Sequence, residues 1–277
     1  MTTSADDFQA EITRRYDAPM YRAMLEVYGD QIHPGFLEGE TDDLRAAALR
    51  ATARLAELAR AAPDARVIET ACGVGGSARY LAAERGASVL ATNIARAQLA
   101  IAADWTKGRP AAERIRFEFA DYHALPYADA SFDVYWCQDS LLFSTDRPRA
   151  LAEAARVVRP GGTIAVSDLV VVGEPGAGAA ALLAEISAPG FWSAEDYRKG
   201  LGAAGFEAIV AEDWSRHVRP SFDRIAAEIV AKRARLAAIA SAADVEDTLE
   251  RYALWRKAAH TGHLGWAAFV GTRRTTP

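Results

Sequence analysis

The segment Glu69-Thr-Ala-Cys-Gly73-Val-Gly75-Gly76 is a glycine-rich turn between a short β-branched run, residues 66–70, and a helical pattern that continues to Arg85. Glycines at such a turn let the backbone approach a ligand closely, and the start of the helix offers free N–H groups with a partial positive charge. The segment therefore predicts a strand, a ligand-binding loop and a helix in succession.

Strand and helix patterns continue to alternate outward from this turn. An Ala- and Leu-rich helix over residues 44–60 precedes it. After it we expect strands over 88–92, 115–119, 132–137 and 163–169, helices over 95–107 and 147–158, and a turn at 159–162. Beyond a loop at 173–178 we expect a helix over 193–204, a strand over 207–212, two helices within 220–260 and a last strand over 264–272. This order predicts an α/β fold, a Rossmann-like doubly wound sheet of seven strands with the last one antiparallel, a helical cap and a helical insertion.

Composition and charge exclude several classes of protein. The formal net charge of −5 gives no long-range attraction to nucleic acid or to an anionic membrane surface, and the chain has no run of about 18 apolar residues that could span a bilayer. The polar, acidic start of the chain does not resemble a secretory signal. Cys72 and Cys137 lack a metal-ligand spacing, which favours reduced thiols and no metal site. We expect a soluble, cytoplasmic protein without nucleic-acid or membrane partners. The sequence leaves open whether the protein forms a homo-oligomer.

The glycine-rich loop by itself does not identify its ligand. Taken as Ala71-x-Gly73-x-x-Gly76, it resembles the dinucleotide fingerprint of dehydrogenases, and a tight turn without a ligand is a further alternative. Glu69 favours another ligand, because a carboxylate at the end of the first strand would repel a pyrophosphate and would suit the ammonium group of a bound amino acid.

Polar residues that follow the next strands favour an adenosine site. Asp121 comes after the third strand and can accept a hydrogen bond from an adenine amino group, with a helix cap as the alternative. Asn93 ends the second strand, where ribose hydroxyls are commonly bound, with a strand-end turn as the alternative. Combined with Glu69, these residues favour a cofactor that joins an amino acid to adenosine.

Several segments resemble known families. Residues 69–76, Asp121, Ser131-Phe-Asp-Val134 and Arg159-Pro-Gly-Gly162 follow the order of the motifs of class I methyltransferases, which use S-adenosylmethionine. A closer resemblance, to the sarcosine/dimethylglycine N-methyltransferases, runs from about Tyr16 to Arg273. It rests on Ile32-His-Pro-Gly35, Gly75-Gly-Ser-Ala-Arg-Tyr-Leu81, Trp136-Cys-Gln-Asp-Ser-Leu-Leu-Phe-Ser144, Ser187-Ala-Pro-Gly-Phe191 and Gly262-His-Leu-Gly-Trp266. The chain departs from that family at Phe143, where the family tends to have histidine.

The motifs and the resemblance together name a set of site residues. For S-adenosylmethionine they are Glu69, Ala71, Gly73, Gly75, Asn93, Gln98, Asp121, Tyr122 and Gln138. For the acceptor they are Tyr21, His33, Phe143, Trp192 and Arg219, and for catalysis His33, Gln138 and Asp139. We expect one domain in three parts: a cap (1–44), a cofactor-binding core (45–172), and a remainder (173–277) that completes the sheet and carries an acceptor-site insertion at about 216–262.

The resemblance implies transfer of a methyl group from S-adenosylmethionine to a small molecule. A small amine, such as an N-methylated amino acid, is the leading hypothesis for the acceptor. The alternative is C- or O-methylation of a natural product or prenylated metabolite, because Phe143 makes the acceptor side more apolar. A non-catalytic cofactor-binding protein and a dehydrogenase are the remaining hypotheses. Methyl transfer from a sulfonium is an in-line displacement, so the protein mainly supplies alignment and desolvation.

Overall fold

The structure is a computed structural model that describes residues 14–39, 42–186 and 190–275. Its centre is a seven-stranded sheet in the order β3-β2-β1-β4-β5-β7-β6. The strands are β1 (Arg66–Thr70), β2 (Ser88–Asn93), β3 (Ile115–Phe119), β4 (Phe132–Gln138), β5 (Val158–Val171), β6 (Phe206–Asp213) and β7 (Leu264–Arg273). Strands β1 to β5 are parallel, and β7 runs antiparallel to both β5 and β6. The predicted Rossmann-like sheet with an antiparallel last strand is confirmed.

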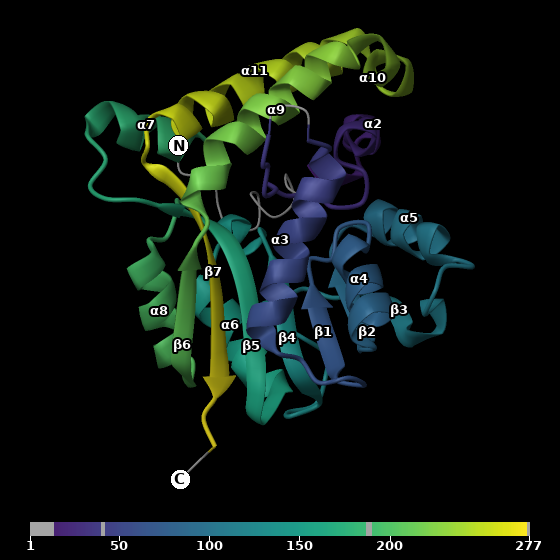
Figure 1. Cartoon of the computed structure of the whole chain (residues 1–277), viewed down its shortest axis with the longest axis vertical. Helices are drawn as coiled ribbons and strands as arrows, with labels where there is room; N and C mark the ends of the chain where they lie inside the picture. The colour runs from purple at the N-terminus through teal and green to yellow at the C-terminus, as the bar shows by residue number, and fades with distance from the viewer. Residues whose placement is uncertain (1–13, 40–41, 187–189, 276–277) are drawn as a thin grey trace.

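Helices cover both faces of the sheet. Alternate residues of each strand point to opposite faces, so each face presents side chains against which helices pack. Val67 and Trp136 pack on the face that carries α3 (Leu44–Ala59) and α4 (Gly76–Arg85), near α5 (Arg96–Thr106). Ile68 and Tyr135 pack on the other face, against α6 (Arg147–Val157) and α8 (Ala194–Ala203). Figure 1 shows α3 in front of the strands and α6 behind them.

Three details differ from the prediction. The segment after Val172 contains a helix, α7 (Ala177–Ile186), where we expected only a loop at 173–178. The predicted turn at 159–162 is an irregularity inside β5, where the register with β4 shifts. The insertion contains three helices instead of two, namely α9 (Val218–Ala231), α10 (Arg233–Ile239) and α11 (Ala242–His260). The breaks between them fall at Lys232 and Ala240, so neither glycine nor proline marks them in the sequence.

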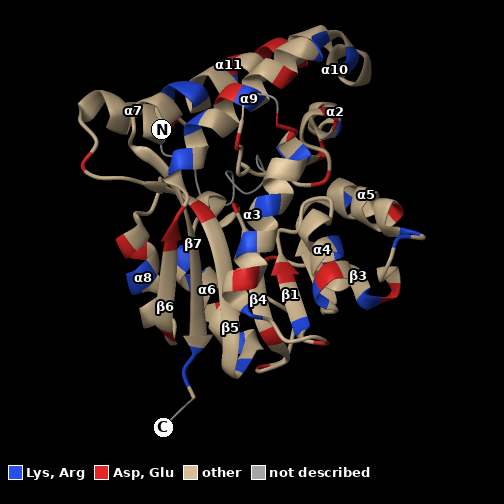
Figure 2. Cartoon of the chain, viewed as in Figure 1, with Lys and Arg blue, Asp and Glu red and all other residues tan. Residues whose placement is uncertain are grey.

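The N-terminal helix α2 (Pro19–Tyr28) and the insertion lie together above the carboxyl ends of β1 and β4 (Figure 1). Lys232 donates to the carbonyl oxygen of Glu26 at 2.8 Å, and the Tyr28 and Tyr252 hydroxyls are 2.7 Å apart, so α2 is tied to both α9 and α11. We call α2 with α9–α11 the roof. Figure 2 shows charges of both signs interspersed along the roof helices. None of the helices in the described ranges has the length and apolar character needed to cross a bilayer.

Candidate functional site

Three neighbouring cavities lie between the carboxyl ends of the strands and the roof. The first, the loop cavity, measures about 40 Å³ and contains Glu69, Gly73 and Gln138 in its lining. The second, the Asp121 cavity, measures about 30 Å³. The third, the roof cavity, measures about 370 Å³. Ala71 lines the first two, His33 lines the first and third, and Phe143 lines the second and third. The three cavities therefore adjoin one another and share walls.

The backbone of the glycine-rich loop takes the left-handed conformation at Ala71 (φ +54°), Gly73 (φ +55°) and Gly75 (φ +80°). A Cβ atom on Gly75 would lie 2.8 Å from the Phe117 ring, so this glycine is required by packing and does not line the cavities. A Cβ atom on Gly76 would lie 2.0 Å from the carbonyl oxygen of Asp30. The chain just after α2 therefore rests directly on the start of α4 and closes the loop cavity from above.

Two buried polar atoms in the loop cavity have no partner among the described residues: Oε2 of Glu69 and Nε2 of Gln138. Glu69 is 3% exposed, and burial raises its pKa to about 8 although the positive charge of Arg79 opposes the shift. Oε1 of Gln138 accepts from Ser77 at 2.7 Å, which leaves its Nε2 to donate elsewhere. Because orphaned buried polar atoms are costly, the pair fits a ligand with an ammonium for Glu69 and a carboxylate for Gln138. The methionine part of S-adenosylmethionine has both groups.

In the Asp121 cavity, hydrogen bonds to one oxygen of the Asp121 carboxylate hold the side chain in place. Oδ1 of Asp121 accepts from the backbone N–H and from Nδ1 of His123, both at 2.8 Å, and Nε2 of His123 lies 2.8 Å from the Ser144 hydroxyl. Partial burial would raise the pKa of Asp121, but the hydrogen bonds from His123 outweigh it and lower that pKa. Asp121 therefore stays ionised, and its second oxygen can accept a hydrogen bond from an adenine amino group. Tyr122 also lines this cavity.

Asn93 lines the Asp121 cavity, but its side chain is already engaged with the protein. Its Nδ2 donates to Gln98 at 2.7 Å and its Oδ1 accepts from the N–H of Ala95 at 3.1 Å. Gln98 is 2% exposed and does not line any of the three cavities. The structure therefore places Gln98 behind Asn93, where it orients the Asn93 amide.

His33 and Asp139 lie where the loop and roof cavities meet, with His33 Nδ1 4.0 Å from Asp139 Oδ2. Both ring nitrogens of His33 contact the protein: Nδ1 lies 2.8 Å from the Pro34 carbonyl oxygen and Nε2 3.2 Å from the Thr52 hydroxyl. Burial lowers the pKa of His33 to about 4, so the ring is neutral at pH 7. A neutral ring with both nitrogens engaged orients its surroundings and is a poor proton acceptor.

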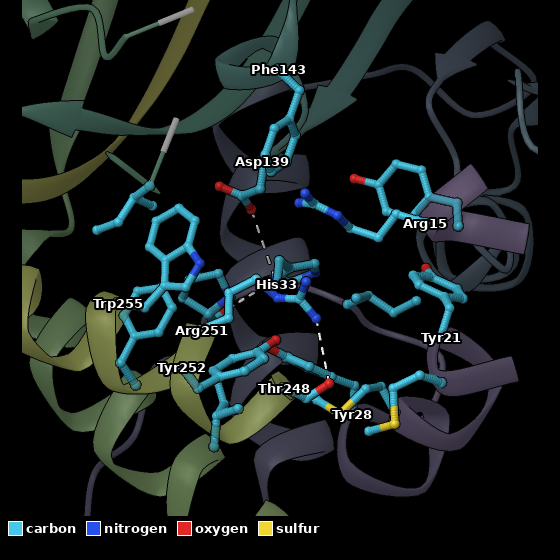
Figure 3. A pocket seen from close by; sticks show the side chains of 18 of the residues that line it. Arg15, Tyr21, Tyr28, His33, Asp139, Phe143, Thr248, Arg251, Tyr252 and Trp255 are labelled. Carbon is cyan, nitrogen blue, oxygen red and sulfur yellow. Dashed lines mark hydrogen bonds and ion pairs between the residues drawn. The ribbon is translucent and has the colours of Figure 1, made fainter. Parts of the chain in front are cut away.

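Asp139 is the better candidate for proton transfer. It follows β4 with a left-handed backbone (φ +51°), an unfavourable conformation that often marks functional positions. Trp266 donates to its Oδ1 at 2.7 Å and Ser167 to its Oδ2 at 3.1 Å. Burial, and secondarily the nearby Asp168 carboxylate, raises the pKa of Asp139 to about 8. Its side chain is 5% exposed and points into the roof cavity (Figure 3).

Apolar side chains from the roof and from the sheet edge form most of the roof cavity. They include Met20, Met24, Ile32, Leu142, Phe143, Leu169, Ile186, Phe222, Ile225 and Trp255. Polar groups are fewer. Figure 3 shows Arg15, from the chain before α2, and Arg251, from α11, reaching toward the middle of the cavity. Tyr21 lines the cavity beside them, as the sequence predicted for the acceptor site.

Two residues proposed for the acceptor do not reach any of these cavities. Trp192 packs edge-on against Tyr197 with ring centroids 5.2 Å apart, and lies over Gly200 of α8 on the far side of the sheet edge. The Arg219 side chain is 68% exposed and faces Asp223 at 3.9 Å on the outer surface of α9. Both side chains point away from the cavities, and the spacing of the residues along the sequence does not reveal this direction. Residues 187–189 of the motif before Trp192 lie outside the described residues.

Sequence reasoning missed His123, Arg15 and Arg251. A signal for Arg251 was present, because polar residues recur every three or four positions through α11, at Asp244, Thr248 and Arg251. This spacing places them on one helix face. His123 stands two residues after Asp121, the local spacing at which a side chain can fold back onto a turn carboxylate.

Comparisons with known proteins agree with this geometry. Residues 68–166 match the family model described as a methyltransferase domain. The chain is 33% identical to the 27-O-demethylrifamycin SV methyltransferase of Amycolatopsis mediterranei (strain S699), over 92% of this chain and 94% of that protein. It is 30% identical to the sarcosine/dimethylglycine N-methyltransferase of Halorhodospira halochloris, over 97% and 98%. Among solved structures, that of the [4+2]-cyclase SpnF superimposes with a TM-score of 0.84 at 28% identity, over 96% of each chain.

The relatives therefore include enzymes named for oxygen and for nitrogen acceptors. Both relatives are methyltransferases, and this agrees with a loop cavity suited to an amino acid and an Asp121 cavity suited to adenine. This chain belongs to the class I methyltransferases that transfer a methyl group from S-adenosylmethionine to a small molecule.

Proposed function

We propose that this methyltransferase methylates a hydroxyl group on a natural-product acceptor of medium size with a largely apolar body. The observation that carries the proposal is the roof cavity, which measures about 370 Å³ and has mostly apolar walls. Cavities of roughly 300–1,000 Å³ are typical for drug-sized ligands. At about 30 Å³ per water molecule, the cavity has room for roughly twelve waters. A small amino acid such as sarcosine would leave most of this space empty.

The apolar lining supports the same conclusion. A small amino acid could contact only part of the lining and would leave most of the methionine, leucine and phenylalanine side chains without an apolar partner. An apolar acceptor body gains free energy from the same contact, about 25 cal/mol for each Å² removed from water. The geometry therefore favours the natural-product hypothesis over the amine hypothesis.

Bound S-adenosylmethionine supplies the methyl group on a positively charged sulfur, and Glu69, Gln138 and Asp121 are the residues that would hold it. An alcohol must lose its proton as it is methylated, and Asp139 is the carboxylate placed to accept it. Each Asp139 oxygen already accepts one hydrogen bond but has a second lone pair free. Asp139 ionises more readily when a cation lies nearby, since opposite charge lowers the pKa of a carboxyl group.

The roof shields much of the site from solvent. α2, α9 and α11 cover the side of the cavity that faces away from the strands, and Leu142 and Phe143 cover the sheet side. Excluding water strengthens the interaction of Asp139 with the acceptor hydroxyl and prevents water from competing for the methyl group. Trp266 and Ser167 fix the Asp139 carboxylate, so its orientation is set before the acceptor binds.

Methylation of a small amine remains a second candidate because the chain is 30% identical to a sarcosine/dimethylglycine N-methyltransferase over nearly its whole length. Methylation of an amine that arrives neutral needs no base, whereas methylation of a hydroxyl does. The two hypotheses therefore differ in how strongly turnover depends on Asp139.

The test is a competition experiment with methyl-labelled S-adenosylmethionine. Hydroxylated polyketide macrocycles, sarcosine and dimethylglycine are offered together, and products are identified by mass spectrometry. We expect kcat/KM for a hydroxylated macrocycle to exceed that for either amino acid by at least about 100-fold. Asp139→Asn should lower turnover by about 100-fold or more, the usual size of a general-base contribution, while Asp129→Asn, a change at an exposed residue paired with Arg156, should not. Faster methylation of sarcosine, or an unimpaired Asp139→Asn variant, would overturn the proposal.

A further inference from the structure

We propose that the roof cavity contains an anion-binding subsite at Arg251, so that the acceptor carries a carboxylate or phosphate group at the end remote from the hydroxyl that is methylated. The inference rests on the proposed function, since it takes the roof cavity as the acceptor site. It adds a charged group to an acceptor whose body is apolar.

The first observation is that the guanidinium of Arg251 has few partners among the residues that the structure describes. This side chain projects from α11 into the cavity (Figure 3). A guanidinium has five N–H donors, yet in the described part of the chain the hydrogen bond recorded for Arg251 is a long one, from Nη2 to the Thr248 hydroxyl at 3.4 Å. No carboxylate of the described residues lies within ion-pair distance of it. Half-buried donors of this kind are normally matched by an acceptor.

The second observation is a like charge nearby. Arg15 enters the cavity from the N-terminal side and reaches toward the same central region (Figure 3). Burial lowers the pKa of Arg251, and the positive charge of Arg15 lowers it further. A positive charge nearby raises the free energy of the half-buried Arg251 guanidinium, and an anion bound to Arg251 would offset that cost. Arg15 and Arg251 come from opposite ends of the chain, so the fold itself creates this arrangement.

The acidic residues near Arg251 do not neutralise it. Asp244 and Asp247 line the mouth of the cavity but are exposed, where water and salt screen their charges. Asp244 is also held by the Ser241 hydroxyl at 2.6 Å as part of the start of α11. Asp139 lies at the opposite wall, on the strand side. Asp247 raises the pKa of Arg251 by less than burial and Arg15 lower it, so the positive charge of Arg251 inside the cavity is not offset by these carboxylates.

A hydroxyl pair adds a further donor beside the arginines. The Tyr28 and Tyr252 oxygens lie 2.7 Å apart and both residues line the cavity. One hydroxyl donates to the other, and the second proton is left to donate to a ligand. Burial raises the pKa of both groups, so neither ionises and repels an anion at neutral pH. Arg251 and the tyrosine pair thus lie on the roof side of the cavity, opposite Asp139 (Figure 3).

This arrangement defines the acceptor by its chemistry. Its hydroxyl lies against Asp139 on the strand side, its apolar body contacts the methionines and aromatic side chains, and its anionic group reaches Arg251 under the roof. Carboxylate and phosphate both match the planar guanidinium in a bidentate way, so the geometry supports either.

The test measures binding, not turnover. Decanoate, decyl phosphate and decanol are titrated by calorimetry into the full chain saturated with S-adenosylhomocysteine. We expect one or both anions to bind at least tenfold more tightly than decanol, and the tighter anion identifies the source of the charge. Arg251→Gln should bring anion binding to within about twofold of decanol. Arg219→Gln, which removes an exposed arginine outside the cavity, should leave the preference intact.

The controls separate this inference from the proposed function. Decanol binding by the native protein tests whether the cavity accepts an apolar body, and it should be the same in Arg251→Gln. A thermal melt establishes folding, and Arg251→Lys, which keeps the charge, should retain part of the anion preference. Equal binding of all three probes to the native protein, or an anion preference that survives in folded Arg251→Gln, would refute the subsite while leaving the acceptor cavity intact. Failure of decanol to bind at all would count against both proposals.

Discussion

Glu69→Gln should stabilise the cofactor-free protein and weaken cofactor binding at the same time. Burial raises the pKa of Glu69 from 4.5 to about 8. The native fold therefore disfavours the ionised form of Glu69. Below pH 4.5 this group does not reduce the free energy of unfolding, but it lowers that free energy progressively as the pH rises from 4.5 toward 8. Glutamine has nearly the same shape and carries no charge, so it removes this pH-dependent loss.

The magnitude follows from the shift. One pKa unit corresponds to about 1.4 kcal/mol. At pH 7, which is 2.5 units above 4.5, Glu69 is ionised in the unfolded chain but mostly protonated in the native fold, and this difference lowers the unfolding free energy by about 3 kcal/mol. At pH 5 the loss is no more than about 1 kcal/mol. With roughly 2 °C per kcal/mol for a domain of this size, Glu69→Gln should raise the Tm by several degrees at pH 7 and by about 1 °C at pH 5.

Binding should change in the opposite direction. A hydrogen bond to a charged group contributes about 1.5–3 kcal/mol, so loss of the carboxylate should weaken S-adenosylmethionine binding by about 10- to 100-fold. Thermal unfolding at both pH values and titration calorimetry measure the two effects, with Glu57→Gln at an exposed position as the matched control. The reasoning is refuted if Glu69→Gln lowers the Tm at pH 7, or if the cofactor binds it as tightly as it binds the native protein.

Two further substitutions test the cofactor cavities. Gly73→Val should weaken cofactor binding by more than about 100-fold, because a branched residue is strained at φ +55° and its side chain would fill the loop cavity. Circular dichroism should show an intact fold. Unchanged affinity in the folded variant would contradict the assignment of this loop. His123→Ala should raise the KM for S-adenosylmethionine about tenfold with little change in kcat, because His123 only holds the Asp121 carboxylate. His123→Asn, whose amide can replace Nδ1 as donor, should recover part of the loss, and a fall in kcat alone would argue for a different role.

The strands could be predicted from the sequence because buried parallel strands have a strong local signal. Residues 66–70 form a β-branched run that is followed by a glycine-rich turn, and β1 has the predicted bounds. The insertion was harder, since neither glycine nor proline stands at Lys232 or Ala240, and only the Ser241 side chain, which caps the start of α11, marks the second break. Nothing in the residue types at those two positions distinguishes a break from a continuous helix.

Candidate cofactor residues followed from their position at strand ends, whereas acceptor residues depend on packing between distant segments. Glu69 and Asp121 each follow a strand whose carboxyl end must face the site, so the topology alone places them. Arg15 and Arg251 meet only because α2 and α11 pack together. Arg219 borders the same insertion but points outward, and spacing did not separate it from Arg251.

The structure of the complex with S-adenosylhomocysteine tests most directly the central claim, that two small cavities hold the cofactor and the roof cavity holds the acceptor. We expect the amino group of the ligand at Glu69, its carboxylate within hydrogen-bond distance of Gln138 Nε2, and its adenine amino group at Asp121. Its sulfur should face the roof cavity beside Asp139, with that cavity otherwise free of the ligand. An adenosine group in the roof cavity, or an amino acid group remote from Glu69, would contradict the account.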